Sequence, residues 1–427
     1  MEEKPGNKYT KGNYLIVILS LFSVSPFVNT ITNKYLLIFL FYVVLLILRR
    51  KKNFFFKQNV QILAIFYVLL AIQSWLYDGF SVALIYIPLI SFYLPFLILQ
   101  LVGVSFFKYF VKVLYVIALI TTPIWLLQSL IPLFDKVLRL GSELILPYSW
   151  GSVPRSLIIY TAAWSDELFN SSFGLYRNSG AFHEPGAYGV FLNLAIVINT
   201  FITGKLFDRK NLVFIICLMT TFSTAGYITF FVIIIAYLMQ LKINIGIKWF
   251  AVISFFLVSF TIYQNEDFLQ AKVQEQLADQ TYVAKNNLGR YDAHSGRFYA
   301  FFTSLNLFQQ HPFFGRGILY ATSEKASGEM NAEGSYTYGF MGVLSNYGLF
   351  FGLLYLFYMY KGFMFLGQIT RQNNTFIIGC FIAVNLALMS QVFITSIIIM
   401  FFFTVGVYNK GIVKQNIKKI KRDVQLA

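Results

Sequence analysis

The sequence predicts an all-α polytopic membrane protein that forms a single integral membrane domain over residues 1–427. Composition is the first observation: 57% of the residues are hydrophobic and 12% are charged, whereas a soluble domain carries about 25% charged residues. The second observation is that apolar runs of roughly 17 or more residues recur along the chain, which is long enough to cross a hydrocarbon core of about 30 Å. These runs do not alternate polar and apolar residues as the strands of a membrane β-barrel do.

Twelve apolar runs are candidate transmembrane helices. They cover residues 13–28, 35–48, 60–76, 82–104, 110–131, 188–203, 212–222, 226–241, 247–263, 338–360, 375–391 and 393–408. The seventh and eighth runs are also compatible with one long tilted helix, although Ser223, Thr224 and Gly226 interrupt the apolar pattern. We therefore expect about twelve spans.

The basic residues predict the orientation of these spans. The net charge is +16, which taken alone would suggest nucleic acid as a partner. With the N-terminus inside, however, most of the 34 Lys and Arg residues fall on cytoplasmic segments and most of the 18 acidic residues fall on outer segments. This is the positive-inside pattern. We predict that both termini are cytoplasmic, that the basic clusters at 49–52 and 414–422 contact anionic membrane lipid, and that nucleic acid is not a partner.

Two connections are much longer than the others, at residues 132–187 and 264–337, and both face outward in this topology. They combine turn residues with amphipathic stretches, which favours short helices lying on the membrane over a separate globular domain. Residues 272–285 predict one such surface helix. Ser295 is a suitable N-cap for a second helix that runs to about Gln310, where His311-Pro312 and the following glycines end it.

The first outer loop carries a compact group of charged residues just before a span. Residues 174–189 read GLYRNSGAFHEPGAYG and contain Arg177, His183 and Glu184 among turn-forming Gly and Pro. Glu184 has two interpretations: it is a general base whose pKa is raised by burial, or it is an acidic cap at the start of a helix. The adjacent His183 is either the general base itself or only a neighbour of Glu184.

The second outer loop supplies another candidate, Arg297, in the first turn of the helix that follows Ser295. A helix N-terminus presents free N–H groups and partial positive charge, and a guanidinium adds bidentate contacts to phosphate oxygens. If Arg177 converges on it from the first loop, the pair suits a pyrophosphate. The alternative is that Arg297 only pairs with Asp292 or extends to the membrane surface.

The sequence predicts neither a metal site nor a cofactor. Cys217 and Cys380 both lie inside apolar runs, and His294 and His311 have no ligand partners at the spacing that zinc sites use. The chain has no P-loop, no glycine-rich dinucleotide motif and no G-x-S-x-G motif.

Four blocks resemble the O-antigen and capsular polysaccharide polymerases (Wzy-type). The pattern R-x-x-G-x-F-x-E-P-G at 177–186 leads into a span, and TTFSTAG at 220–226 is similar to a turn that in the family carries an Arg where this chain has Thr or Ala. Residues 295–317 resemble an Arg-led helix followed by H-P-x-x-G-x-G, and LSNYGLFFG at 344–352 resembles the segment entering the next span. The order of the blocks, with two large outer loops, is more specific than any block alone.

The related O-antigen ligases carry a His-Asn pair just before the last of these blocks. Counting back from Gly348, the matching positions are Thr337 and Tyr338. This departure favours a polymerase over a ligase. A lipid-linked oligosaccharide flippase is a third alternative, but transporters commonly show internal repeats and ionisable residues within their spans, and neither is evident here.

The resemblance implies metal-independent glycosyl transfer at the outer face of a bacterial cytoplasmic membrane. The donor would be a glycan on undecaprenyl pyrophosphate, and the acceptor would be a lipid-linked repeat unit. In this mechanism Arg177, Glu184 and Arg297 are the candidate catalytic residues. His183, Arg290, His311 and Arg316 are the candidate substrate-binding residues. A chain-length regulator is a further candidate partner.

Overall fold

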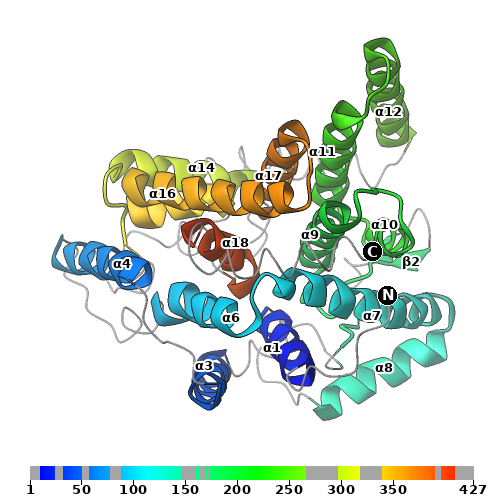
Figure 1. The fold of residues 1–427 in the computed structure, drawn as a ribbon. Helices are drawn as coiled ribbons and strands as arrows, with labels where there is room; N and C mark the ends of the chain where they lie inside the picture. Colours follow the sequence, from blue (N-terminus) through cyan, green and yellow to red (C-terminus); the bar gives the residue numbers. More distant parts are fainter. Residues whose placement is uncertain are drawn as a thin grey trace, which may run out of the picture.

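The protein is described by a computed structural model in which the helices pack against one another (Figure 1) and enclose a buried apolar core. The structure describes residues 10–24, 32–50, 57–76, 88–145, 157, 159–162, 169–170, 174–265, 297–317, 339–389 and 396–408. Everything below refers to those residues.

Helices account for almost all of the described chain. In the N-terminal half they are α1 (Thr10–Phe22), α3 (Thr32–Arg49), α4 (Lys57–Leu76), the π-helix η1 (Leu89–Tyr93), α6 (Leu94–Val102), α7 (Ser105–Leu130) and α8 (Pro132–Ile145). In the C-terminal half they are α9 (Pro185–Thr203), α10 (Arg209–Thr220), α11 (Thr224–Gln240), α12 (Ile245–Asn265), α14 (Arg297–Gln310), α16 (Gly339–Ile369), α17 (Asn374–Met389) and α18 (Ile397–Val407).

A helix lies at each of the twelve apolar runs, with η1 and α6 together occupying the fourth. The prediction of a helical membrane protein is confirmed. Among the described helices, α7, α9 and α16 are long and apolar enough to cross a membrane by themselves, and seven more apolar helices are shorter. The count of twelve crossings therefore stays a prediction.

The seventh and eighth runs are two helices, not one. α10 ends at Thr220, Phe222 adopts a left-handed conformation with φ 45°, and Ser223 begins α11 by accepting a hydrogen bond from the N–H of Gly226 through its side chain. A left-handed Phe cannot continue an α-helix, so the chain must turn here. The polar interruption in the sequence correctly marked this boundary.

The first outer loop contains one element that the sequence analysis did not predict. Strand β1 (Phe169–Asn170) pairs antiparallel with β2 (Leu175–Tyr176), so the fold is not purely helical. The loop also begins with the amphipathic helix α8, as expected. The surface helix predicted at 272–285 lies outside the described residues, whereas the predicted helix ending at Gln310 is α14.

The core is centred on α9 and α18, whose residues are almost entirely buried. α16 and α18 approach so closely that a Cβ on Gly406 would lie 1.8 Å from the carbonyl oxygen of Tyr358, and a Cβ on Gly362 would lie 2.0 Å from that of Phe402. Backbone contact of this kind needs small residues at the crossing, as is common between membrane helices.

Polar contacts gather the basic residues at one end of the helices. The guanidinium of Arg50 donates to the side chain of Asn13 and to the carbonyl of Leu101, and the ammonium of Lys112 donates to the hydroxyl of Tyr14 at 3.1 Å. We call this the basic end. It unites the start of α1, the end of α3, the end of α6 and the start of α7, all of which the sequence analysis placed on the cytoplasmic side.

Contacts at the other end join segments that were predicted to face outward. The side chain of Gln73, near the end of α4, donates to the carbonyls of Phe314 and Asn346. The hydroxyl of Tyr188, near the start of α9, lies 3.1 Å from that of Thr121 in the second half of α7. We call this the motif end because it holds the four blocks described above.

Candidate functional site

The segment 177–184, which we call the first motif loop, connects strand β2 to helix α9. It turns sharply at Gly180, whose φ is +54° and where a Cβ would lie 2.6 Å from the ring of Tyr188. Glycine is required there both for the left-handed backbone and for the close approach of the ring. Arg177 lies before this turn and Glu184 after it, at the N-cap of α9.

Aromatic rings fix this loop to the bundle. The ring of Phe182 stacks on Tyr188 with centroids 5.5 Å apart and on Phe191 with centroids 4.7 Å apart. All three side chains are buried. Because such rings are held by extensive apolar contact and by their mutual geometry, the loop has a defined position even though it turns at Gly180.

The α10–α11 turn receives the start of the loop. The Nε of Arg177 donates to the carbonyl of Thr221 at 3.3 Å. Asn178 donates to Thr220 twice, from its backbone N–H to the carbonyl and from its side chain to the hydroxyl, each at 2.9 Å. Two of the blocks that were recognised separately in the sequence thus form one unit in space.

The hydrogen bond to Thr221 fixes the direction of one edge of the Arg177 guanidinium. Its Nε is turned to the α10–α11 turn, and the guanidinium also lies within electrostatic range of the hydroxyl of Tyr227 in α11. The side chain is only half-buried. A guanidinium has five donors in a planar fork, so a contact through Nε is compatible with binding an oxyanion through the two terminal nitrogens.

Glu184 occupies the N-cap position of α9, with extended backbone angles of φ −149° and ψ 159°. Its side chain makes no capping hydrogen bond to this helix. The position therefore agrees with the cap interpretation, but the characteristic interaction of a cap is not made. Glu184 and His183 are both half-buried, and the assignment of a base stays a prediction.

The second motif loop, residues 311–317, follows α14 and docks on α16 mainly through its backbone. The N–H of Arg316 donates to the carbonyl of Ser345 at 2.8 Å, and the N–H of Gly317 donates to the carbonyl of Asn346 at 3.1 Å. The Nε of Arg316 reaches the side chain of Asn346 at 3.3 Å. Arg316 is 2% exposed, so its guanidinium lies inside this contact.

The helix that receives the second loop is broken at Gly348. This residue has φ 78°, and a Cβ there would lie 2.1 Å from the carbonyl oxygen of Phe313. The break frees backbone carbonyls of α16, and the loop and Gln73 supply donors to them. Unsatisfied carbonyls are costly away from water, which explains why the H-P-x-x-G-x-G and L-S-N-Y-G blocks occur together.

His311 lies at the start of the second loop, where partial burial and then the positive charge of Arg316 lower its pKa below the ordinary value. The imidazole is therefore neutral at physiological pH and can accept as well as donate a hydrogen bond. This suits contact with sugar hydroxyls better than contact with a pyrophosphate.

The structure leaves the pairing of Arg177 with Arg297 untested. Arg297 is the first residue of α14, but its side chain, like the whole of Arg290, lies outside the described residues. Figure 1 shows α14 beside α16, whereas β2, which precedes Arg177, lies near α7 and α10. The described residues therefore form two docked loops, and their convergence on one substrate stays a prediction.

A polar network that the sequence analysis missed lies beneath the first motif loop. Arg139 on α8 pairs with Asp135 at 2.9 Å and donates to the hydroxyl of Tyr176 at 3.2 Å. Asp135 also accepts from Gln128, which in turn accepts from Tyr160. Burial opposes the charge of Arg139, but the oxygens of Asp135 and Tyr176 raise its pKa above the ordinary value.

The only sequence signal of this network was the i, i+4 spacing of Asp135 and Arg139 on an amphipathic helix. That spacing is common on exposed helices and did not single the pair out. The network reaches the residue directly before Arg177, so it helps to position the loop.

Comparison with known families identifies part of this assembly. Residues 211–356 match the family model described as O-antigen ligase, Wzy_C. This region is similar to the O-antigen ligase family. No curated protein matches the chain. The matched region begins in α10 and contains the α10–α11 turn, the second motif loop and the break in α16; the first motif loop precedes it.

The match confirms the family resemblance drawn from the sequence and supports a membrane glycan-processing enzyme. It does not distinguish a polymerase from a ligase. Among the described residues, no group of three or more His, Cys, Asp or Glu side chains lies together.

Proposed function

We propose that this protein is a polysaccharide polymerase of the outer face of the bacterial cytoplasmic membrane. It transfers a glycan from undecaprenyl pyrophosphate to a lipid-linked repeat unit. The observation that carries the proposal is the docking of the first motif loop on the α10–α11 turn. Through it Arg177 and Asn178 contact the region that matches the family, and His183 and Glu184 follow on the same loop.

The reaction assigns a role to each charged residue of the motif end. A sugar hydroxyl of the repeat unit attacks the anomeric carbon of the donor, and the bond from that carbon to the pyrophosphate oxygen breaks. Glu184 takes the hydroxyl proton, and the electron pair leaves with the lipid pyrophosphate. Arg177 and Arg297 stabilise the charge that develops there. A single displacement inverts the anomeric configuration.

The remaining candidates bind the substrates. His183 and His311 contact sugar hydroxyls. Arg290, in the second outer loop, binds the anionic part of a substrate. Arg316 is buried against Asn346, and we assign it the role of holding the second loop on α16. The mechanism uses guanidinium groups where other transferases use a divalent ion, so activity should survive chelation with EDTA.

Reconstitution distinguishes the polymerase from its alternatives. Purified protein in proteoliposomes is given one lipid-linked repeat unit and no other acceptor. A polymerase produces a ladder of longer lipid-linked glycans. A ligase forms new glycosidic bonds only when a separate glycolipid acceptor is added, and a flippase moves the substrate across the bilayer without forming any. A single unchanged band would contradict the proposal.

The orientation is tested separately. Reporter fusions at Gly151 and Lys285 should be external, and a fusion at Lys410 should be internal. An internal reading at Lys285 would place the second loop on the wrong side for a shared site with Arg177, even if the chain proved to be a glycosyltransferase.

A further inference from the structure

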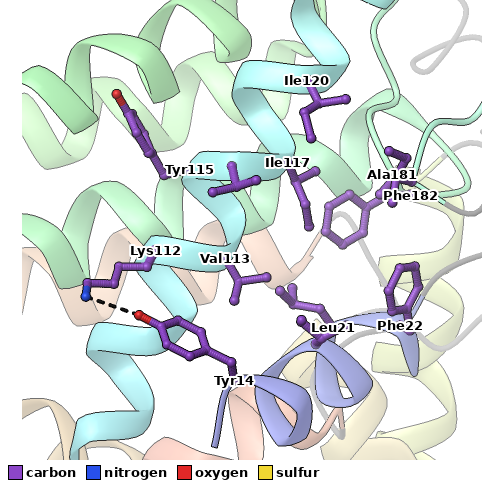
Figure 2. Close-up of a pocket in the computed structure, with 13 residues that line it drawn as sticks. Tyr14, Leu21, Phe22, Lys112, Val113, Tyr115, Ile117, Ile120, Ala181 and Phe182 are labelled. Carbon is purple, nitrogen blue, oxygen red and sulfur yellow. Dashed lines mark hydrogen bonds between the residues drawn. The ribbon is translucent and has the colours of Figure 1, made fainter. Parts of the chain in front are cut away.

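An apolar groove of about 560 Å³ runs between α1 and α7 and reaches the first motif loop. Figure 2 shows the side chains that line it. Residues of α1 and α7 form most of the lining: Tyr14, Ile18, Leu21 and Phe22 from α1, and Lys112, Val113, Tyr115, Val116, Ile117 and Ile120 from α7. A groove with this lining favours a hydrocarbon chain.

The two ends of the groove differ. Ala181 and Phe182 of the first motif loop lie at one end. At the other, basic end the ammonium of Lys112 donates to the hydroxyl of Tyr14 and lies 5.9 Å from the centroid of its ring. The ring of Tyr14 packs edge-on against Tyr109, with centroids 4.6 Å apart. The groove thus has one apolar end and one cationic, aromatic end.

Further lysines gather at the cationic end. Lys108 is one helical turn before Lys112 on α7. Lys210 comes from α10, which packs on α7 through an edge-on contact of Phe214 with Tyr115 at 6.1 Å. Lys112 and Lys210 lie about one turn before Tyr115 and Phe214 respectively, and the two lysines are within electrostatic range of each other.

The titration of Lys210 agrees with this placement. Burial lowers its pKa, Asp208 opposes that effect, and Lys112 and Lys108 lower the pKa further. Lys108 and Lys112 therefore lie within electrostatic range of Lys210, and Lys112 itself lines the groove. A charge cluster of this kind attracts an anion, and phosphate is the anion that membranes supply in the largest amount.

The length of the groove fits one leaflet. Lys112 and Ile120 are eight residues apart on α7, which corresponds to about 12 Å at 1.5 Å per residue. Half of a hydrocarbon core of about 30 Å is about 15 Å. A ligand with its phosphate at the lysines would therefore place its chain within the leaflet on the basic side.

We propose that the groove between α1 and α7 binds an acyl chain of an anionic glycerophospholipid, whose phosphate lies at the cluster of Lys108, Lys112 and Lys210. The tyrosines at the mouth suit the interfacial level of the headgroup. The site is independent of the proposed glycosyl transfer. A lipid that binds only the folded protein stabilises it by mass action. Anionic lipid should therefore stabilise the packing of α1 against α7.

The test uses the full-length protein in neutral detergent, titrated with phosphatidylglycerol or with phosphatidylcholine. Retained lipid is counted by native mass spectrometry, and the Tm is followed in parallel. Lys112→Gln removes one charge at the mouth, and Ile117→Trp fills the groove. The matched controls are Lys136→Gln, an exposed lysine on α8, and Leu119→Trp, an exposed residue of α7 that does not line the groove.

Phosphatidylglycerol should be retained and should raise the Tm of the wild type more than phosphatidylcholine does. Lys112→Gln should weaken phosphatidylglycerol binding about fivefold, the contribution of one lysine near a membrane surface, with little effect on phosphatidylcholine. Ile117→Trp should abolish retention of both lipids, and the two controls should behave like the wild type.

Two results would overturn the proposal. The first is the absence of any charge dependence: the wild type retains the two lipids equally, or Lys112→Gln retains as much phosphatidylglycerol as Lys136→Gln does. This comparison stands even if the tryptophan variant fails to fold. The second is displacement of bound phosphatidylglycerol by undecaprenyl phosphate in both the wild type and Lys112→Gln, because the groove would then belong to the lipid-linked substrate.

Discussion

The two motif loops are held on the helical bundle by different means. The first is anchored mainly by side chains, with one backbone hydrogen bond from Asn178 to Thr220: the ring of Phe182 enters the core, and the side chains of Arg177 and Asn178 reach the α10–α11 turn. The second is anchored by its backbone, which pairs with carbonyls of α16 around Gly348. The first loop keeps three charged or titratable side chains half-buried at its surface, whereas the second buries its Arg316.

This difference indicates a division of work between the loops. A loop held by its backbone has a fixed path whatever most of its side chains are, which suits a scaffold. Under the proposed function, the half-buried side chains of the first loop contact the substrate, and their chemistry decides the activity. Substitutions in the second loop should therefore affect folding first, and substitutions in the first loop should affect catalysis first.

The largest effect is expected from Gly348→Ala. The residue has φ 78°, and a Cβ would lie 2.1 Å from the carbonyl oxygen of Phe313, so the loop must leave α16. Left-handed strain alone costs about 1–3 kcal/mol, and the freed carbonyls add to it. We expect little monodisperse protein after solubilisation, measured by fluorescence-detected gel filtration.

Gly189→Ala is the matched control, because Gly189 is also a buried glycine but lies within a regular helix, α9. Its added Cβ would meet its nearest neighbour, the Cα of Gly226, at an ordinary 3.6 Å. It should yield protein like the wild type. If Gly348→Ala elutes and melts as Gly189→Ala does, the backbone lock of the second loop is not what holds it.

Arg177→Ala should have the largest effect on activity with folding preserved. Loss of one oxyanion-stabilising donor typically lowers the rate by about 10²–10³-fold, and polymer should disappear at a normal protein level. Arg177→Lys should rescue poorly because the ammonium lacks the planar fork. The assay is ladder formation in proteoliposomes, with Arg209→Ala as the control because Arg209 is exposed at the start of α10.

Normal ladders from Arg177→Ala would mean that this arginine has only a structural role, in which its hydrogen bond to Thr221 stabilises the α10–α11 turn. A low protein level in the same variant would also indicate a structural role for Arg177. Either outcome would remove the contrast between a catalytic first loop and a scaffolding second loop.

Glu184→Gln should act on the transfer step and leave binding intact. The amide keeps the size of the carboxylate but cannot take a proton, so single-turnover transfer should slow by about 10²-fold, the lower end of general-base effects. Binding of the lipid-linked substrate, measured separately, should be unchanged. Transfer at the wild-type rate in Glu184→Gln, with lower stability in Glu184→Ala, would favour the helix-cap interpretation.

The sequence predicted the helices well because apolar periodicity and length are local properties. Each apolar run holds a helix, and Ser223 and Gly226 correctly marked the turn between α10 and α11. The hairpin β1–β2 was missed because each strand is only two residues long, too short for any periodic signal.

The candidate site was predicted only in its parts. Motif spacing found Arg177, Glu184 and the glycines of the second loop, but not which block contacts which, because those contacts join residues far apart in the sequence. Gln73 and Arg139 were missed for the same reason: a glutamine in an apolar run and an i, i+4 ion pair have many possible roles. Their role depends on tertiary packing, which no local pattern encodes.

The smallest expected effect comes from comparing two asparagines that make the same local hydrogen bond, one buried in the first loop and one in an exposed turn. The side-chain oxygen of Asn178 accepts from the N–H of Gly180 at 2.9 Å, and that of Asn244 accepts from the N–H of Gly246 at 2.8 Å. Asn178 is fully buried, whereas Asn244 is exposed. Asn178→Ala leaves buried groups unpaired and should lower the free energy of unfolding by about 1–3 kcal/mol.

Asn244→Ala should lower it by much less, because water replaces the lost partner. Thermal unfolding in detergent measures both, and ladder formation shows whether Arg177 still works when its neighbour is removed. We expect Asn178→Ala to keep a reduced but measurable activity, since Arg177 retains its own contact with Thr221. Equal melting of the two variants would mean that the first loop is held by its rings alone, and complete loss of activity would make Asn178 as important to the site as Arg177.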